Sequence, residues 1–234
     1  IVYYVGCDTA YQQPQIARAF LKILNAAQAD FTLLSGEHST GKPLSLLGYH
    51  DEARAMAERL VAEVRKAKPR LLVTTCPSAF DAFKTDYPAW GLDFSGIEVL
   101  HATQYLDRLI EQEVVVPRRQ SAAIATFLDG TYLGRTHGIY DEPRRILGRI
   151  ANLAVREMVW SRELAYSCGE PGGVLPLLHP ELSRGMAERV LDEASKTGAD
   201  TLVTSCPATM TALQGVKRPG LAVRDLVEVV ADAL

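Results

Sequence analysis

Short apolar runs alternate with longer amphipathic segments along this chain of 234 residues. The short runs have the length and the flanking turn residues of strands, whereas the longer segments carry apolar residues at the spacing of helices. This alternation is typical of βα units around a mostly parallel sheet. The predicted strands are residues 1–6, 30–34, 70–75, 97–100, 122–127, 156–160 and 201–205, and the predicted helices are residues 14–27, 52–67 and 182–196, with a further helix that has Pro143 in its first turn.

The sequence repeats itself at a shift of 130 residues. Met-Ala-Glu-Arg at 56–59 returns at 186–189, and Leu-Val-Thr-Thr-Cys-Pro at 72–77 returns at 202–207 with a single Thr-to-Ser change. Such self-similarity indicates a duplicated structural unit, and a proline-bearing polar stretch between the copies suits a linker. We therefore predict an α/β fold of two tandem, similar subdomains, with mostly parallel sheets and flanking helices. Their predicted bounds are residues 1–116 and 121–234.

Composition and charge exclude several classes of protein. With 47% hydrophobic and 23% charged residues, the chain can bury a full core, so disorder is not expected. A net charge of −3 and a pI near 6.0 give no basic footprint, so we expect no nucleic acid partner. No apolar run approaches the ~18 residues of a membrane helix, and no signal peptide is recognisable. The chain starts at Ile1, inside a predicted strand, so we expect preceding residues to have been removed or to belong to a longer precursor.

The four cysteines stand where a parallel sheet binds ligands. Cys7, Cys76 and Cys206 each follow a predicted strand directly, and Cys168 opens a glycine-rich loop. Four cysteines are too few for a disulfide scaffold in a chain of this length. Because ligands bind outside the carboxyl ends of parallel strands, we expect a functional site there that uses two cysteines from each half.

The cysteines and their neighbours resemble a known motif. In the first half it consists of Cys7, Ser-Thr-Gly at 39–41 and Cys-Pro-Ser-Ala at 76–79. The second half repeats it with Thr131, Ser-Cys-Gly at 167–169 and Cys-Pro-Ala-Thr at 206–209. In order and spacing this resembles the cysteine-rich CCG motif, where two adjacent cysteines precede a glycine. The resemblance covers nearly the whole chain and is to heterodisulfide reductase B/D subunits and related iron–sulfur oxidoreductases.

The resemblance implies a non-cubane 4Fe-4S cluster, held in that family by the five cysteines of one motif. Cluster iron is ordinarily held by thiolates, which serine and threonine hydroxyls do not replace at neutral pH. We therefore expect the cluster to be lost or altered and the motifs to be degenerate. The candidate catalytic residues are the remaining thiols, as remnant ligands or dithiols: Cys7, Cys76, Cys168 and Cys206. The former cluster pockets would be lined by Ser39, Thr40, Gly41, Thr131, Ser167, Gly169 and Thr209. Ala79 stands at the last position of the first motif.

Three hypotheses for the thiols stay open. Cys7 with Cys76, and Cys168 with Cys206, are redox-active or structural dithiols. Alternatively, His38 joins Cys7 and Cys76 as ligands of a zinc ion or a small iron site. The third hypothesis is a cluster-free structural or assembly subunit that kept the fold and lost the chemistry.

The function implied by the resemblance is that of a cysteine-rich domain or subunit of a heterodisulfide-reductase-like electron-transfer oxidoreductase. The implied partners are other subunits or domains of such a complex, such as a ferredoxin-type iron–sulfur or flavin subunit. The expected location is the cytoplasm, with membrane association only through partner subunits. Glycine-rich residues 169–173 lack the spacing of a nucleotide-binding loop, and no serine has the partners of a hydrolase triad.

Overall fold

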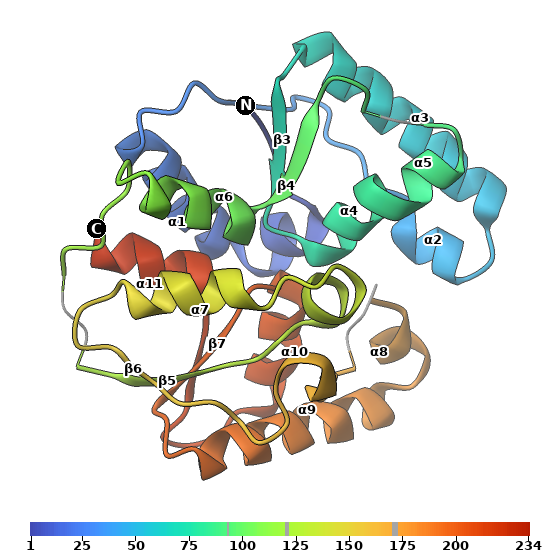
Figure 1. Ribbon diagram of the computed structural model, residues 1–234. Helices are drawn as coiled ribbons and strands as arrows, with labels where there is room; N and C mark the ends of the chain where they lie inside the picture. Colours follow the sequence, from blue (N-terminus) through green and yellow to red (C-terminus); the bar gives the residue numbers. More distant parts are fainter. Residues whose placement is uncertain (93, 120–121, 170–172) are drawn as a thin grey trace.

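The fold is built from two parallel sheets with the same strand order. The computed structural model describes residues 1–92, 94–119, 122–169 and 173–234, and within them each sheet has four strands (Figure 1). The order is β2-β1-β3-β4 in the first sheet and β6-β5-β7-β8 in the second. The predicted duplication of an α/β unit is therefore confirmed. The strands are β1 (Val2–Tyr4), β2 (Thr32–Leu33), β3 (Leu71–Thr74), β4 (Glu98–His101), β5 (Ile124–Phe127), β6 (Ala154–Val155), β7 (Thr201–Thr204) and β8 (Ala222–Asp225).

Helices connect successive strands, as parallel pairing requires. The three longer predicted helices are all present, with ends within two residues of prediction. In the first half the helices are α1 (Pro14–Ala26), α2 (Lys42–Leu46), α3 (His50–Ala67), α4 (Pro77–Asp81), α5 (Tyr87–Ala89) and α6 (Ala102–Glu111). In the second half they are α7 (Asp141–Gly148), α8 (Val174–Leu178), α9 (Pro180–Lys196), α10 (Pro207–Val216) and α11 (Leu226–Ala233). Short π-helical turns occur at η1 (Asp8–Gln12), η2 (Ala82–Asp86) and η3 (Thr131–Thr136), and a 3₁₀ turn at η4 (Arg162–Leu164).

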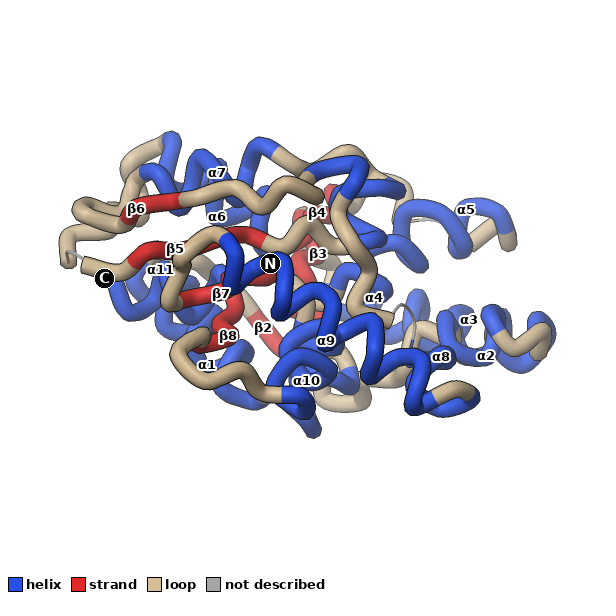
Figure 2. Tube along the Cα trace, turned by 90° about the horizontal axis from the view of Figure 1, so that it is seen from below, coloured by secondary structure: helices blue, strands red, loops and turns tan. Residues whose placement is uncertain are grey.

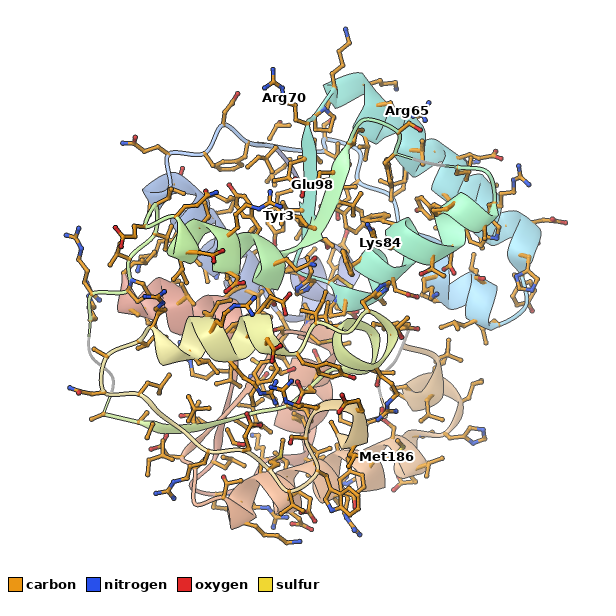
Figure 3. All side chains as sticks on the ribbon, in the orientation of Figure 1. Tyr3, Arg65, Arg70, Lys84, Glu98 and Met186 are labelled. Atoms are coloured by element: carbon orange, nitrogen blue, oxygen red, sulfur yellow. The ribbon has the colours of Figure 1, made fainter. Side chains whose placement is uncertain are left out.

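Four helices, arranged in two layers, lie between the two sheets. Helix α1 packs on α11, and α6 packs on α7 (Figure 1). Tyr3 of β1 reaches these helices, and its ring lies 4.8 Å from that of Phe20 on α1 (Figure 3). The same buried cluster continues through Leu106 on α6 to Phe127 and Val203 of the second sheet. The two halves therefore share one hydrophobic core.

The outer faces of the sheets are covered separately. Helices α3 and α4 bury the outer face of the first sheet, and α9 and α10 that of the second. Figure 2 shows α2 and α8 at the same end of the molecule, as Figure 1 does. The order of layers is thus helix, sheet, two layers of central helices, sheet and helix. Among the described residues, no helix is long and apolar enough to cross a membrane.

The duplication extends to helix starts. The His101 side chain accepts the backbone N–H of Thr103 at the start of α6, and the Asp225 side chain accepts that of Val227 at the start of α11. At both helix starts, the side chain three positions after the cap residue (Gln104 or Glu228) accepts the backbone N–H of that cap residue. These reciprocal bonds satisfy donors that a helix start leaves free.

Two strand predictions need correction. The strand predicted at 156–160 is wrong, because pairing with β5 ends at Val155. Beyond it the Arg156 guanidinium bonds the Thr197 carbonyl, and Val159 is 84% exposed. Strand β8 was not predicted, because Arg224 and Asp225 interrupt its apolar pattern.

Because the core is shared, we expect unfolding to be one cooperative transition. Replacing Leu106, which is fully buried between the two sheets, by alanine should lower the free energy of unfolding by about 2–5 kcal/mol. Leu182→Ala, at a side chain that is 56% exposed, should change it by less than about 0.5 kcal/mol. Urea unfolding followed by circular dichroism and by tryptophan fluorescence would measure both. Separate transitions for the two halves would contradict the shared core.

Candidate functional site

A small cavity lies at the carboxyl ends of strands from both halves. Its volume is about 180 Å³. Cys7 comes after β1, Cys76 caps α4 after β3, and Cys206 caps α10 after β7. We call this space the thiol cavity; it is lined by Tyr4, Gly6, Cys7, Asp8, Ser39, Thr40, Pro43, Cys76, Ser78, Ala79, Tyr132, Gly173, Cys206 and Ala208.

The first motif is assembled around this cavity. Cys7, Ser39, Thr40 and Cys76 all line it, together with Ala79 at the motif's last position. Cys7 is exposed and Cys76 is buried. The fold therefore brings five motif positions to one place.

The residues of the second motif are distributed differently. Cys206 lines the thiol cavity, but Cys168 does not, and it is buried in the apolar cluster under α9. Thr131 begins η3 and Thr209 is buried on α10, so neither lines the thiol cavity. The Ser167 hydroxyl accepts the backbone N–H of Gly169. Cys206 therefore lies at this cavity together with Cys7 and Cys76.

The motif glycines hold their loops against helices. Gly41 has a φ of 80°, and a Cβ there would lie 2.5 Å from the backbone oxygen of Ala53 on α3. Gly169 has a φ of 81°, and its Cβ would lie 3.0 Å from the Cα of Ser183 on α9. Positive φ and close backbone approach both favour glycine. Gly41 and Gly169 therefore hold the two motif loops against α3 and α9.

Carboxylates surround the thiols. The Glu37 carboxylate accepts the backbone N–H groups of Val5 at 2.8 Å and Gly6 at 2.7 Å. Burial raises the pKa of the Cys7 thiol, and the charges of Asp8 and Glu37 raise it further. Burial raises the pKa of Cys76 to about 11, although a hydrogen bond with Ser78 opposes this. Both thiols are therefore protonated at neutral pH.

A metal site at His38 is not assembled. His38 is exposed and does not line the thiol cavity. Its backbone carbonyl accepts the hydroxyl of Tyr4 at 3.0 Å. The described residues contain no group of three or more His, Cys, Asp or Glu side chains that could hold a metal ion.

A buried ionic cluster joins the halves beside the cavity. The Lys42 ammonium lies 2.6 Å from the Asp81 carboxylate and 2.8 Å from that of Asp86. His137 of the second half lies 2.9 Å from the other Asp81 oxygen. Burial lowers the pKa of Lys42, but its bonds to both carboxylates outweigh this and raise it. Lys42 also lies 5.5 Å from the ring centre of Tyr132, which lines the cavity.

Sequence reasoning missed these charged residues. Asp8 is adjacent to Cys7, and Lys42 is adjacent to Gly41, so proximity to the motif could have marked both. Asp81 and His137 lie far apart in the sequence, and only the packing of η3 on α4 brings them together.

Comparison with known proteins identifies the family. A family model described as "Cysteine-rich domain", CCG, matches residues 1–80 and 125–214. The chain belongs to this CCG family. A dihydromethanophenazine:CoB–CoM heterodisulfide reductase from Methanosarcina barkeri has a D subunit that is 31% identical over 241 residues, which cover 100% of this chain and 59% of that protein. An EtfAB:quinone oxidoreductase from Syntrophomonas wolfei is 26% identical over 92% of this chain and 31% of its own length.

This CCG chain thus spans 59% or less of the length of these two relatives. Among solved structures, a glutamate racemase from Bacillus anthracis covers 99% of the chain and 79% of its own, with 14% identity and a TM-score of 0.43. A likeness this weak carries no functional argument.

We expect removal of the buried Lys42 cation to destabilise the fold strongly. In Lys42→Met, the Asp81 and Asp86 carboxylates lose their buried cation, which should cost about 3–5 kcal/mol. Lys66→Met removes the exposed pair with Glu63 on α3 and should cost no more than about 1 kcal/mol. Urea unfolding of both variants measures the difference. Equal losses would show that the cluster contributes nothing beyond a surface pair.

We expect alkylation of the cavity thiols to be slow at neutral pH and to become faster only at high pH. Because only the thiolate is nucleophilic, raised pKa values leave less thiolate at pH 8 than in free cysteine. Iodoacetamide should modify Cys7 before buried Cys76, with rates that still rise above pH 9. Asp8→Asn removes a negative charge and should speed Cys7 modification, whereas Asp51→Asn on the exposed start of α3 should not. Mass spectrometry of the peptides measures each rate, and a Cys7 rate that plateaus below pH 8 would contradict the expectation.

Proposed function

We propose that this chain is the cysteine-rich part of an electron-transfer oxidoreductase related to heterodisulfide reductases, and that its thiol cavity holds no 4Fe-4S cluster. The observation that carries the second statement is the set of side chains at the cavity. Of the five positions of the first motif, Cys7 and Cys76 supply thiols, whereas Ser39, Thr40 and Ala79 do not. Cys206 adds one thiol from the other half.

The donor set does not fit the cluster. Four-iron clusters are held by about four cysteine thiolates, and Ala79 has no donor atom in its side chain. The hydroxyls of Ser39 and Thr40 already accept the backbone N–H groups of Gly41 and Lys42. These local bonds stabilise the loop without any metal.

The charges at the cavity disfavour the cluster as well. Thiolate ligands would place negative charge beside the carboxylates of Asp8 and Glu37, both of which raise the pKa of Cys7. Among the described residues that line the cavity there is no lysine, arginine or histidine to compensate. The site therefore favours neutral thiols.

A dithiol that exchanges electrons through the thiolate fraction of its cysteines is the second candidate. Two thiols that form a disulfide release two electrons and two protons, which an oxidant such as a small-molecule disulfide accepts. The observation in its favour is that Cys7, Cys76 and Cys206 share one cavity of about 180 Å³. A structural or assembly role without chemistry is the alternative.

Partner subunits or domains would complete the electron path. The relatives named above are considerably longer than this chain, and one is named as a subunit. We propose that a ferredoxin-type iron–sulfur or flavin subunit exchanges electrons with this chain. The proposed location is cytoplasmic, with membrane association through those partners.

Iron and acid-labile sulfide analysis tests the cluster-free cavity. The protein purified without oxygen should contain well under one iron per chain and show no 4Fe-4S absorption or paramagnetic signal after reconstitution. Restoring the motif with S39C, T40C and A79C provides the matched control and should increase iron binding. About four irons with sulfide in the unmodified chain would overturn the proposal.

Thiol counts before and after oxidation then separate the dithiol, which loses two thiols reversibly, from the assembly role, which loses none.

A further inference from the structure

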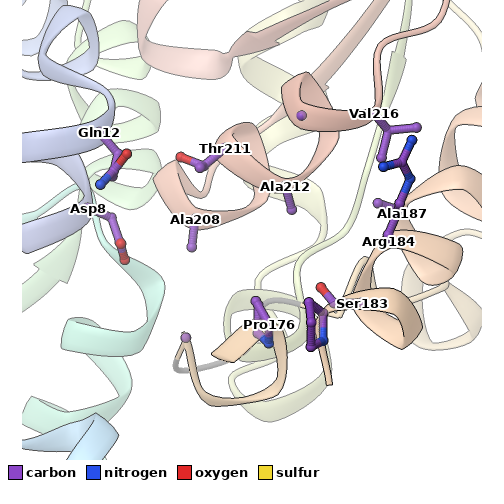
Figure 4. A pocket seen from close by; sticks show the side chains of 13 residues that line it. Asp8, Gln12, Pro176, Ser183, Arg184, Ala187, Ala208, Thr211, Ala212 and Val216 are labelled. Carbon is purple, nitrogen blue, oxygen red and sulfur yellow. The ribbon is translucent and has the colours of Figure 1, made fainter. Parts of the chain in front are cut away.

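A second and larger cleft opens beside the thiol cavity. Its volume is about 500 Å³, within the usual range of small-molecule sites. It lies between η1, α8, α9 and α10 (Figure 4). Asp8, Gly173 and Ala208 line both spaces, so the two adjoin. We call the larger space the side cleft.

The middle of the side cleft is apolar and lined by small side chains. Ala208 and Ala212 of α10 face it from one side (Figure 4). Pro176 of α8 and Ala187 of α9 line it as well. These short side chains leave the volume open and offer contacts for methyl-sized groups.

The two ends of the side cleft carry opposite charges. Figure 4 shows Asp8 and Gln12 at one end and Arg184 at the other. Asp8 is half-buried, its carboxylate makes no hydrogen bond or ion pair with another described residue, and burial raises its pKa. A cation at this end would supply the missing partner.

Arg184 offers terminal guanidinium N–H donors at the opposite end of the side cleft. Its Nε lies 3.3 Å from Glu188, and its side chain is 62% exposed. The terminal guanidinium N–H groups are the part of the side chain that suits a carboxylate. Polar hydroxyls of Ser183 and Thr211 lie along the same cleft.

We propose that the side cleft binds a zwitterion of the size of a short peptide, with its ammonium group at Asp8 and its carboxylate at Arg184. The apolar part of this ligand contacts the alanines and Pro176 between the two ends. The order of charges favours this class, because a dianion would face the unpaired Asp8 and an uncharged ligand would leave it unpaired. The binding site goes beyond the proposed electron transfer and does not depend on whether the thiol cavity holds iron.

Binding of trialanine, measured by isothermal titration calorimetry, tests the proposal. Trialanine carries both charges and methyl side chains, N-acetyl-trialanine lacks the ammonium group, and trialanine amide lacks the carboxylate. We expect trialanine to bind and each blocked form to bind about tenfold more weakly or worse, since each loses a charge-assisted hydrogen bond. Failure of trialanine to bind at millimolar concentration would overturn the proposal, as would equal binding of all three.

Variants of Asp8 and Arg184 test which end of the side cleft binds which charge of the ligand. Asp8→Asn should weaken trialanine about tenfold but leave N-acetyl-trialanine unchanged, and Arg184→Gln should weaken trialanine similarly but leave trialanine amide unchanged. Arg54→Gln is the matched control, because Arg54 on α3 makes the equivalent ion pair with Glu58 at 3.1 Å but does not line the side cleft. An equal loss in Arg54→Gln would contradict the assignment. Thermal unfolding of each variant without ligand confirms that it is folded.

Discussion

The packing of two central helix layers between the sheets is the constraint on which the rest of the molecule depends. Helix α1 follows β1 but packs on α11 from the other half, and α7 follows β5 but packs on α6. Each half therefore buries its apolar helix faces against the other, which buries far more apolar surface than either could alone. This arrangement fixes the orientation of the two sheets. As a result the carboxyl ends of β1, β3 and β7 meet at a single cavity.

That meeting explains why the thiol cavity takes residues from both halves. Cys206 of the second half caps α10 and lines this cavity with Cys7 and Cys76 of the first half, whereas Cys168 is buried in the apolar cluster under α9. The contact between Asp81 of the first half and His137 of the second half joins the two halves beside this cavity. The charged environment of the cavity is likewise composite: its carboxylates come from the first half, and α10 of the second half contributes a helix start.

Much of the fold could be read from the sequence, because hydrophobic periodicity and the repeat are local signals. Residues 14–27 predicted α1 closely, and the cysteines after the strands marked the correct edge of the sheets. The prediction of a strand at 156–160 was wrong. The apolar residues Met158 and Val159 give this segment the pattern of a strand, but pairing with β5 stops before them. β8 was missed because Arg224 and Asp225 interrupt its apolar pattern. The presence of Cys206 at one cavity with Cys7 and Cys76 could not be predicted, since it depends on how the two halves pack.

The loops at Gly41 and Gly169 have a consequence for how such a protein can change over time. Each loop is held by its glycine against a helix and by hydroxyl-to-backbone bonds within the loop. None of these contacts involves a thiol, so the cysteines beside the glycines can be exchanged for serine or threonine while the loop keeps its course. A cavity without a cluster, as proposed above, would keep walls that can hold a different occupant. Such a chain would also fold without any apparatus that assembles and inserts iron–sulfur clusters.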